Sequence, residues 1–192
     1  MRKILLLTAL FLAFALPAVA GELLVNGDFE QALDVGWTDT VQLEAGTYFF
    51  DRTDTLGQPS PGFVAVVHKE LARYASLRQT VDVPDLNLDL SFDCRLKIGG
   101  GSSTCWPVAS FWVRYADSSG IELGNTRFYL HDQYATWQKS DTVDLVNVAD
   151  TTGAWRHYVI NLKEHVDSRL PGINADQVKK ITLDLFAYDN GT

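Results

Sequence analysis

The chain has 192 residues, with 24 acidic and 16 basic side chains, a formal net charge of −8 and 46% hydrophobic residues. This hydrophobic content is typical of a globular domain, and the acidic balance argues against nucleic acid or an anionic membrane surface as a partner. After the first twenty residues no apolar segment is long enough to cross a membrane, so membrane insertion is not expected.

The first twenty residues are typical of a secretory signal peptide. Arg2 and Lys3 form a short positive region, residues 4–16 are apolar, and the Ala-Val-Ala sequence at 18–20 matches a cleavage site. A buried N-terminal helix is the alternative. Cleavage would leave 172 residues with 14 basic and 24 acidic side chains. We therefore predict an exported protein, secreted, periplasmic or at the cell surface, with one domain over residues 21–192.

Short apolar and alternating segments follow one another along the rest of the chain. The clearest is residues 86–97, where apolar and polar side chains alternate strictly, as in a strand with one buried face. A short helix is expected only at 163–170. Strands are predicted at residues 23–25, 41–50, 63–67, 77–83, 86–97, 108–115, 121–130, 142–148, 155–162 and 181–188. This succession predicts an all-β fold, a two-sheet β-sandwich of the jelly-roll kind.

The two cysteines, Cys94 and Cys105, are expected to form a disulfide, because an exported protein meets oxidising conditions. If their strands form an antiparallel hairpin, Leu90 lies opposite Ala109 and Leu88 opposite Phe111. The inward-facing side chains of both strands would then be apolar, as is required of paired strands that share one buried face. Such a bridge would stabilise the fold by up to about 3 kcal/mol. Consecutive strands of a sandwich can also belong to different sheets, so this register is a hypothesis.

Residues that alternate away from the core are candidates for ligand binding. Aromatic rings can cover the apolar C–H faces of sugars, and charged side chains can hydrogen-bond their hydroxyl groups. On the strand from residue 108, Trp112 and Arg114 are predicted to face outward, and the hypothetical hairpin would place Asp93 and Arg95 beside them. Trp106, Tyr129 and Trp137 are candidates for the rim of this site. The alternative is that a loop covers Trp112 and the ring is structural.

Four stretches together resemble a known family. They are Asn26-Gly27-Asp28-Phe29-Glu30 with Gly36-Trp37 after it, residues 76–83, residues 113–117 and residues 155–162. Their order and spacing resemble the galactose-binding-like jelly rolls, especially carbohydrate-binding modules of families four, nine and twenty-two. The resemblance covers nearly all of the chain after residue 20 and implies a carbohydrate ligand. The same fold also serves in adhesins and surface proteins, so it does not specify a sugar.

The resemblance also implies a structural calcium ion. Glu30 would supply a carboxylate and Asp28 a main-chain carbonyl, although Glu30 can equally cap a turn. In this family a final strand usually follows a segment like residues 181–192. That strand carries an Asp that binds the calcium ion, and here the sandwich would lack it. We therefore expect either that the domain continues past residue 192 or that the calcium site is incomplete.

Catalytic signatures are absent from the sequence. The histidines have no zinc-type spacing, there is no G-x-S-x-G motif, and the loop at 99–103 lacks the lysine of a phosphate-binding loop. We predict a non-enzymatic module that binds polysaccharide or another glycan, possible further domains of the same chain being additional partners. The alternatives are a cell-surface or extracellular domain that is structural or binds protein, and a glycan hydrolase or lyase, which needs only two well-placed carboxylates.

Overall fold

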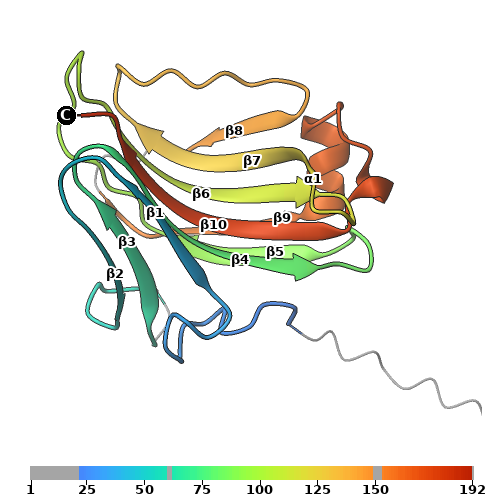
Figure 1. Cartoon of the computed structure of the whole chain (residues 1–192). Coiled ribbons are helices and arrows are strands. Elements are labelled where there is room, and N and C mark those ends of the chain that lie inside the picture. The colour runs from blue at the N-terminus through green and yellow to red at the C-terminus, as the bar shows by residue number, and fades with distance from the viewer. Residues whose placement is uncertain (1–21, 60–61, 149–152, 192) are drawn as a thin grey trace, which may run out of the picture.

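The structure is a computed structural model of the chain, and it describes residues 22–59, 62–148 and 153–191. The predicted signal peptide at 1–20 lies outside the described residues. The described chain folds into a sandwich of two β-layers (Figure 1), which confirms the predicted fold class. Within this part of the chain, no helix has the length and apolar character needed to span a membrane.

One layer is a six-stranded sheet with the strand order β1-β4-β10-β6-β7-β8. The neighbouring strands are antiparallel except for β7 and β8, which are parallel. The connection at 132–142 must therefore return along the sheet from the end of β7 to the start of β8. The strands are β1 (Thr38–Leu43), β4 (Arg73–Asp82), β10 (Lys180–Asp189), β6 (Pro107–Ala116), β7 (Glu122–His131) and β8 (Val143–Asn147).

The second layer consists of two strand pairs, β2 (Tyr48–Thr53) with β3 (Val64–Lys69) and β5 (Asp89–Cys94) with β9 (Arg156–Asn161). Strand β3 packs over β4 and β10. Strand β5 lies over β6 and β7, because the Phe92 ring is 4.4 Å from Phe111 and 5.0 Å from Phe128. No hydrogen-bonded ladder joins β3 to β5 in the described chain.

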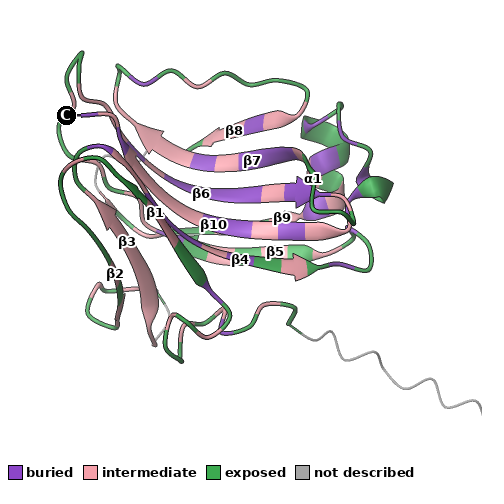
Figure 2. Ribbon diagram, in the orientation of Figure 1, coloured by how far each residue is buried: buried purple, intermediate pink, exposed green. Residues whose placement is uncertain are grey.

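The second layer is consequently incomplete above the central strand β10. Leu185 and Ala187 point inward from this strand, yet both are only half-buried. Figure 2 shows the same contrast, with purple residues along the middle of the large sheet and pink ones along β3. The inner side of β10 is therefore covered less completely than that of β6.

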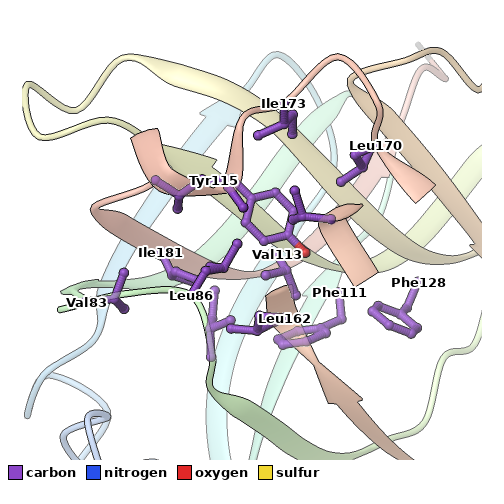
Figure 3. Packing of buried hydrophobic residues seen from close by; sticks show 14 of the residues in the cluster. Val83, Leu86, Phe111, Val113, Tyr115, Phe128, Leu162, Leu170, Ile173 and Ile181 are labelled. Carbon is purple, nitrogen blue, oxygen red and sulfur yellow. The ribbon is translucent and has the colours of Figure 1, made fainter. Parts of the chain in front are cut away.

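The hydrophobic core lies between the layers and is closed at one end by α1 (Leu162–Arg169) and the following turn η1 (Ala175–Gln177). The helix begins where the Asn161 side chain accepts a hydrogen bond from the Glu164 amide, a standard N-cap. The buried cluster is shown in Figure 3 and includes Val113, Tyr115, Phe128, Leu162 and Ile173. Each large side chain buried there contributes about 1.5–3 kcal/mol to folding.

Two predicted strands differ from the structure. Residues 23–25 form no strand, because the Asn26 side chain accepts a hydrogen bond from the Gln31 amide and donates one to the Ala32 carbonyl, which folds the segment into turns. The predicted strand at 41–50 is divided into β1 and β2 by a turn at Gly46, whose φ of 76° favours glycine.

The predicted hairpin between the two cysteine-containing segments is wrong. Cys94 lies opposite Arg156 of β9, whereas β6 pairs with β10 and β7. Cys94 and Cys105 are both free thiols, which contradicts the predicted disulfide. The apolar residues of the two strands matched in the predicted hairpin because both strands face the core. Strands in opposite layers of a sandwich also face the same core, so this match does not show that two strands are paired.

Candidate functional site

The outer face of the six-stranded sheet, the side turned away from the second layer, carries the predicted Trp112. The strand register aligns Arg78, Asp184, Trp112 and Arg127 in one row across β4, β10, β6 and β7. The next row toward the end of β10 contains Ser76, Phe186, Ser110 and Tyr129. Charged and aromatic side chains from four strands therefore share one surface.

An aromatic band crosses this outer face. We define it as Tyr74, Phe186, Trp112, Trp137 and Tyr129, whose successive ring centroids are 5.5, 5.1, 5.6 and 5.5 Å apart. Apart from Trp112, these rings are half-buried, so each keeps part of its surface accessible. The band therefore offers ring surface from β4 to β7.

Trp112 itself is not an exposed platform. It faces outward, as predicted, but only 8% of the residue is accessible. The guanidinium carbons of Arg114 and Arg127 lie 4.1 and 4.0 Å from its ring centroid, and the Trp137 ring meets it at right angles. Its indole N–H donates to Ser110 Oγ at 2.6 Å. The covering loop is the 132–142 connection, which carries Trp137.

Arg114 is held by two carboxylates. Its Nε and Nη2 atoms donate to Asp184 Oδ2 at 3.2 and 2.9 Å, and its Nη1 atom donates to Glu122 Oε2 at 3.1 Å. Asp184 also accepts a hydrogen bond from Ser76 Oγ. All of the terminal nitrogens of Arg114 have a carboxylate partner, so this residue positions the ring of Trp112 rather than presenting free donors.

Arg127 is held differently. Its Nε atom donates to Asn125 Oδ1 at 2.8 Å. Its guanidinium carbon lies over the rings of both Trp112 and Trp137, 4.0 and 4.8 Å from their centroids. Burial, and then the neighbouring charge of Arg114, lower the pKa of Arg127, with Glu122 opposing them. In the described part of the chain no carboxylate lies within ion-pair distance of this guanidinium.

A polar hollow of about 410 Å³ adjoins the band at the β1–β4 edge. Arg78 donates from Nη2 to Thr40 Oγ1 there, and it has no ion-pair partner among the described residues. The hollow is lined by Gly36, Thr38, Thr40, Arg78, Gln79 and Thr80. The site therefore combines ring surfaces with hydroxyl groups and two arginines that lack carboxylate partners.

The structure brings together most, but not all, of the predicted site. Trp112, Arg114, Tyr129 and Trp137 lie together, and Trp106 reaches the band through Tyr188, 5.4 Å from its ring. Tyr188 in turn stacks on Phe186 at 6.3 Å.

The placement of Asp93 and Arg95 beside Trp112 is wrong, because β5 belongs to the opposite layer. Asp93 Oδ1 lies 3.0 Å from His157 Nδ1, and Arg95 donates to the Leu56 carbonyl at 2.8 Å.

Sequence reasoning missed Arg127, Arg78, Tyr74, Asp184 and Phe186 as members of the site. The alternation along residues 181–188 does indicate that Asp184 and Phe186 face away from the core. Their meeting with Trp112 depends on the pairing of β10 with β6, for which the sequence carries no local signal.

Asp28 and Glu30 were the predicted calcium ligands. Asp28 Oδ1 accepts the Glu30 amide at 3.2 Å, and Glu30 Oε1 accepts the Phe63 amide at 3.1 Å. The Arg52 guanidinium donates to the Glu30 carbonyl at 2.7 Å and lies 4.0 Å from Glu30 Oε2. Calcium takes six to eight oxygen ligands. A guanidinium already meets the charge of Glu30, so this arrangement does not by itself fit calcium, and the calcium site stays a prediction.

Comparison with known proteins gives similarity only at the level of solved structures. No protein-family model and no curated protein matches the sequence. A family 11 carbohydrate-binding module from Clostridium thermocellum, solved in complex with a β-1,3-1,4-mixed-linked tetrasaccharide, is 16% identical, with 85% of this chain and 89% of that chain covered and a TM-score of 0.37.

The family 11 module of the cellulosomal cellulase Lic26A-Cel5E of Clostridium thermocellum is 13% identical, with 86% of this chain and 90% of that chain covered and a TM-score of 0.31. Both are carbohydrate-binding modules, but of a different family from the four, nine and twenty-two types that the sequence resembles. The fold assignment above rests on the strands and their pairing.

Proposed function

We propose that this protein is an exported, non-catalytic module that binds a glycan on the outer face of its six-stranded sheet. The observation that carries the proposal is the aromatic band beside a row of hydrogen-bonding side chains, with Phe186 and Tyr74 next to Ser76 and Arg78. Sugar rings have apolar faces that stack on aromatic rings and hydroxyl groups that bond to such polar neighbours. The signal-peptide pattern at residues 1–20 supports export.

The charges on this face favour binding over hydrolysis. A glycosidase needs two carboxyl groups that are free to donate and accept protons at the scissile bond. The two carboxylates beside the band, Asp184 and Glu122, are both ion-paired with Arg114, and Asp184 is buried. Both carboxylates are therefore engaged in holding Arg114, which supports a binding role for this face.

Affinity electrophoresis on a panel of polysaccharides, followed by calorimetry with the best ligand, tests the proposal. Phe186→Ala should weaken binding about two- to tenfold, because stacking on an aromatic ring is worth about 0.5–1.5 kcal/mol beyond burial. The matched control is Phe49→Ala, a Phe on β2 in the other layer that is 47% exposed. The proposal fails if no glycan binds, or if the two folded variants bind a glycan equally well.

A further inference from the structure

We infer that the glycan bound on the outer face is anionic and carries carboxylate groups, as a polyuronate does, and that Arg127 and Arg78 receive them. This inference rests on the proposed function and names the class of its ligand. It follows from the unequal way in which the three arginines of the face are partnered.

Arg127 is the decisive residue. The structure places its guanidinium over two indole rings that meet at right angles and gives it one neutral partner, Asn125, through Nε. In the described chain the Nη1 and Nη2 atoms make no hydrogen bond, and neither is among the fully buried unpartnered atoms, so each keeps some contact with solvent. A partly desolvated cation with two parallel accessible donors is the geometry that binds a carboxylate with two hydrogen bonds.

Arg78 provides a second receiver in the same row of the sheet. It is separated from Arg127 by β10 and β6, which at strand spacings of about 4.8 Å places their backbones about 14 Å apart. Its guanidinium lies in the polar hollow beside Thr38 and Thr40. A polymer crossing the strands along this row could therefore meet both arginines with different sugar units.

The charge balance of the face contrasts with that of the chain. The protein has a formal net charge of −8 and would repel a polyanion at most of its surface. On the outer face Asp184 and Glu122 both pair with Arg114, and together with Arg127 and Arg78 these five groups sum to +1. In the described chain no carboxylate lies within ion-pair distance of Arg127 or Arg78. A neutral glycan would need only hydrogen-bonding groups there. Two guanidinium groups without ion-pair partners, beside aromatic rings on a face with a small positive excess, fit a ligand that supplies both a ring face and a negative charge.

The test compares charged and uncharged forms of the same polymers. Binding of the full exported chain to polygalacturonate and its methyl ester, to alginate and its propylene glycol ester, and to a neutral mixed-linkage β-glucan is measured by calorimetry. The buffer contains 150 mM NaCl so that long-range charge effects are screened. The variants are Arg127→Gln, Arg127→Lys and Arg78→Gln, with Arg169→Gln on α1 as a control that removes the same charge from an exposed arginine away from the outer face.

The wild-type protein should bind at least one acid form about ten- to a hundredfold more tightly than its ester, the range expected for hydrogen bonds to a charged group. Arg127→Gln and Arg78→Gln should each remove part of the preference for the acid over the ester, because each leaves the other arginine in place. Arg127→Lys should recover only part of the loss, and Arg169→Gln should leave the affinity for the acid unchanged. Melting curves establish that each variant is folded. If Arg127→Gln is unstable, the Arg78→Gln and ester comparisons still decide the question.

Equal binding of acid and ester, or binding of the neutral β-glucan alone, overturns this inference while the proposed glycan-binding function stands. Acid binding that is unchanged in folded Arg127→Gln and Arg78→Gln overturns it as well. Failure to bind any of the five polymers or any glycan of the wider panel overturns the proposed function itself.

Discussion

Asp184 and Arg114 form an ion pair at the centre of the outer face, with 2.9 Å between Nη2 and Oδ2 and only 2% of the Asp184 side chain exposed. Burying a carboxylate in this way is costly unless its oxygens are fully hydrogen-bonded. Here Arg114 donates twice to Oδ2, and Ser76 donates to Oδ1. The pair also fixes the Arg114 guanidinium against the ring of Trp112.

Breaking this pair should destabilise the fold far more than breaking the second pair of the same arginine. Asp184→Asn removes the buried charge and should lower the free energy of unfolding by about 3–5 kcal/mol. Glu122→Gln removes a carboxylate that is 39% exposed and should cost less than about 1 kcal/mol. Urea denaturation of the two variants measures both values. Equal losses would show that burial does not govern the strength of these pairs.

Trp112→Ala should lower stability as a core substitution does. The ring is 8% exposed and is covered by Trp137, Phe186 and two guanidinium groups, so its removal should cost about 3–5 kcal/mol and lower Tm by about 10 °C. Tyr134, in the 132–142 connection, is 43% exposed, so Tyr134→Ala serves as the control and should change the free energy of unfolding by less than about 0.5 kcal/mol. A small loss for Trp112→Ala would instead favour the exposed platform expected from the sequence.

The two thiols should remain reduced and react slowly in the native protein. Burial raises the pKa of Cys94 to about 12. A hydrogen bond to Asp189, and then burial, raise the pKa of Cys105. Since the thiolate is the reactive species, alkylation at pH 8 should be slow in buffer and fast in denaturant. The intact mass should be the same with and without reductant. A mass lower by two hydrogens before reduction would instead show the disulfide that the sequence predicted.

Stability should fall as the pH drops below about 6.5, partly because of His165 on α1. Its Nε2 atom lies 3.2 Å from Asp144 Oδ2, and Lys139 Nζ lies 2.6 Å from Asp144 Oδ1. Burial lowers the pKa of His165, and Arg169 and Lys139 act in the same direction, while Asp144 opposes them. The unfolded chain, with a histidine pKa of about 6.5, therefore binds the proton more readily than the folded protein does.

His165→Gln should make this decline shallower between pH 6.5 and the lower pKa of the folded state, because the glutamine cannot take up the proton. Below the folded-state pKa, both states are protonated and the contribution becomes constant. Urea denaturation of wild type and His165→Gln at pH 8, 6.5 and 5 measures the difference. Parallel pH profiles for the two proteins would rule out His165 as the source.

The alternation of apolar and polar residues predicted where strands lie in the sequence more reliably than it predicted which strands pair with each other. Residues 86–97 were identified as a strand, and Phe92 does face the core from β5. The partner of β5 is β9, more than sixty residues later, and not β6. A side-chain pattern records which face is apolar but not which strand lies beside it, so the predicted disulfide and the positions of Asp93 and Arg95 failed together.

The outer face shows the same limit. The alternation of side chains along the strand correctly predicted that Trp112 faces away from the core. Its ring is nevertheless covered, because Trp137 of the 132–142 connection packs on it. That connection crosses the sheet because β7 and β8 are parallel, a property that the sequence of either strand does not reveal. The buried partner of Arg114, Asp184, likewise depends on the register between β6 and β10.

The unjoined pairs of the second layer have a consequence for handling the protein. In the described chain β3 pairs only with β2 and β5 only with β9, so each has one side whose amide and carbonyl groups find no strand partner. Such rows of donors and acceptors can recruit an extended segment from another molecule. Concentrated solutions of residues 21–192 should therefore self-associate, and a short peptide that adds as a strand at this position should keep the domain monomeric.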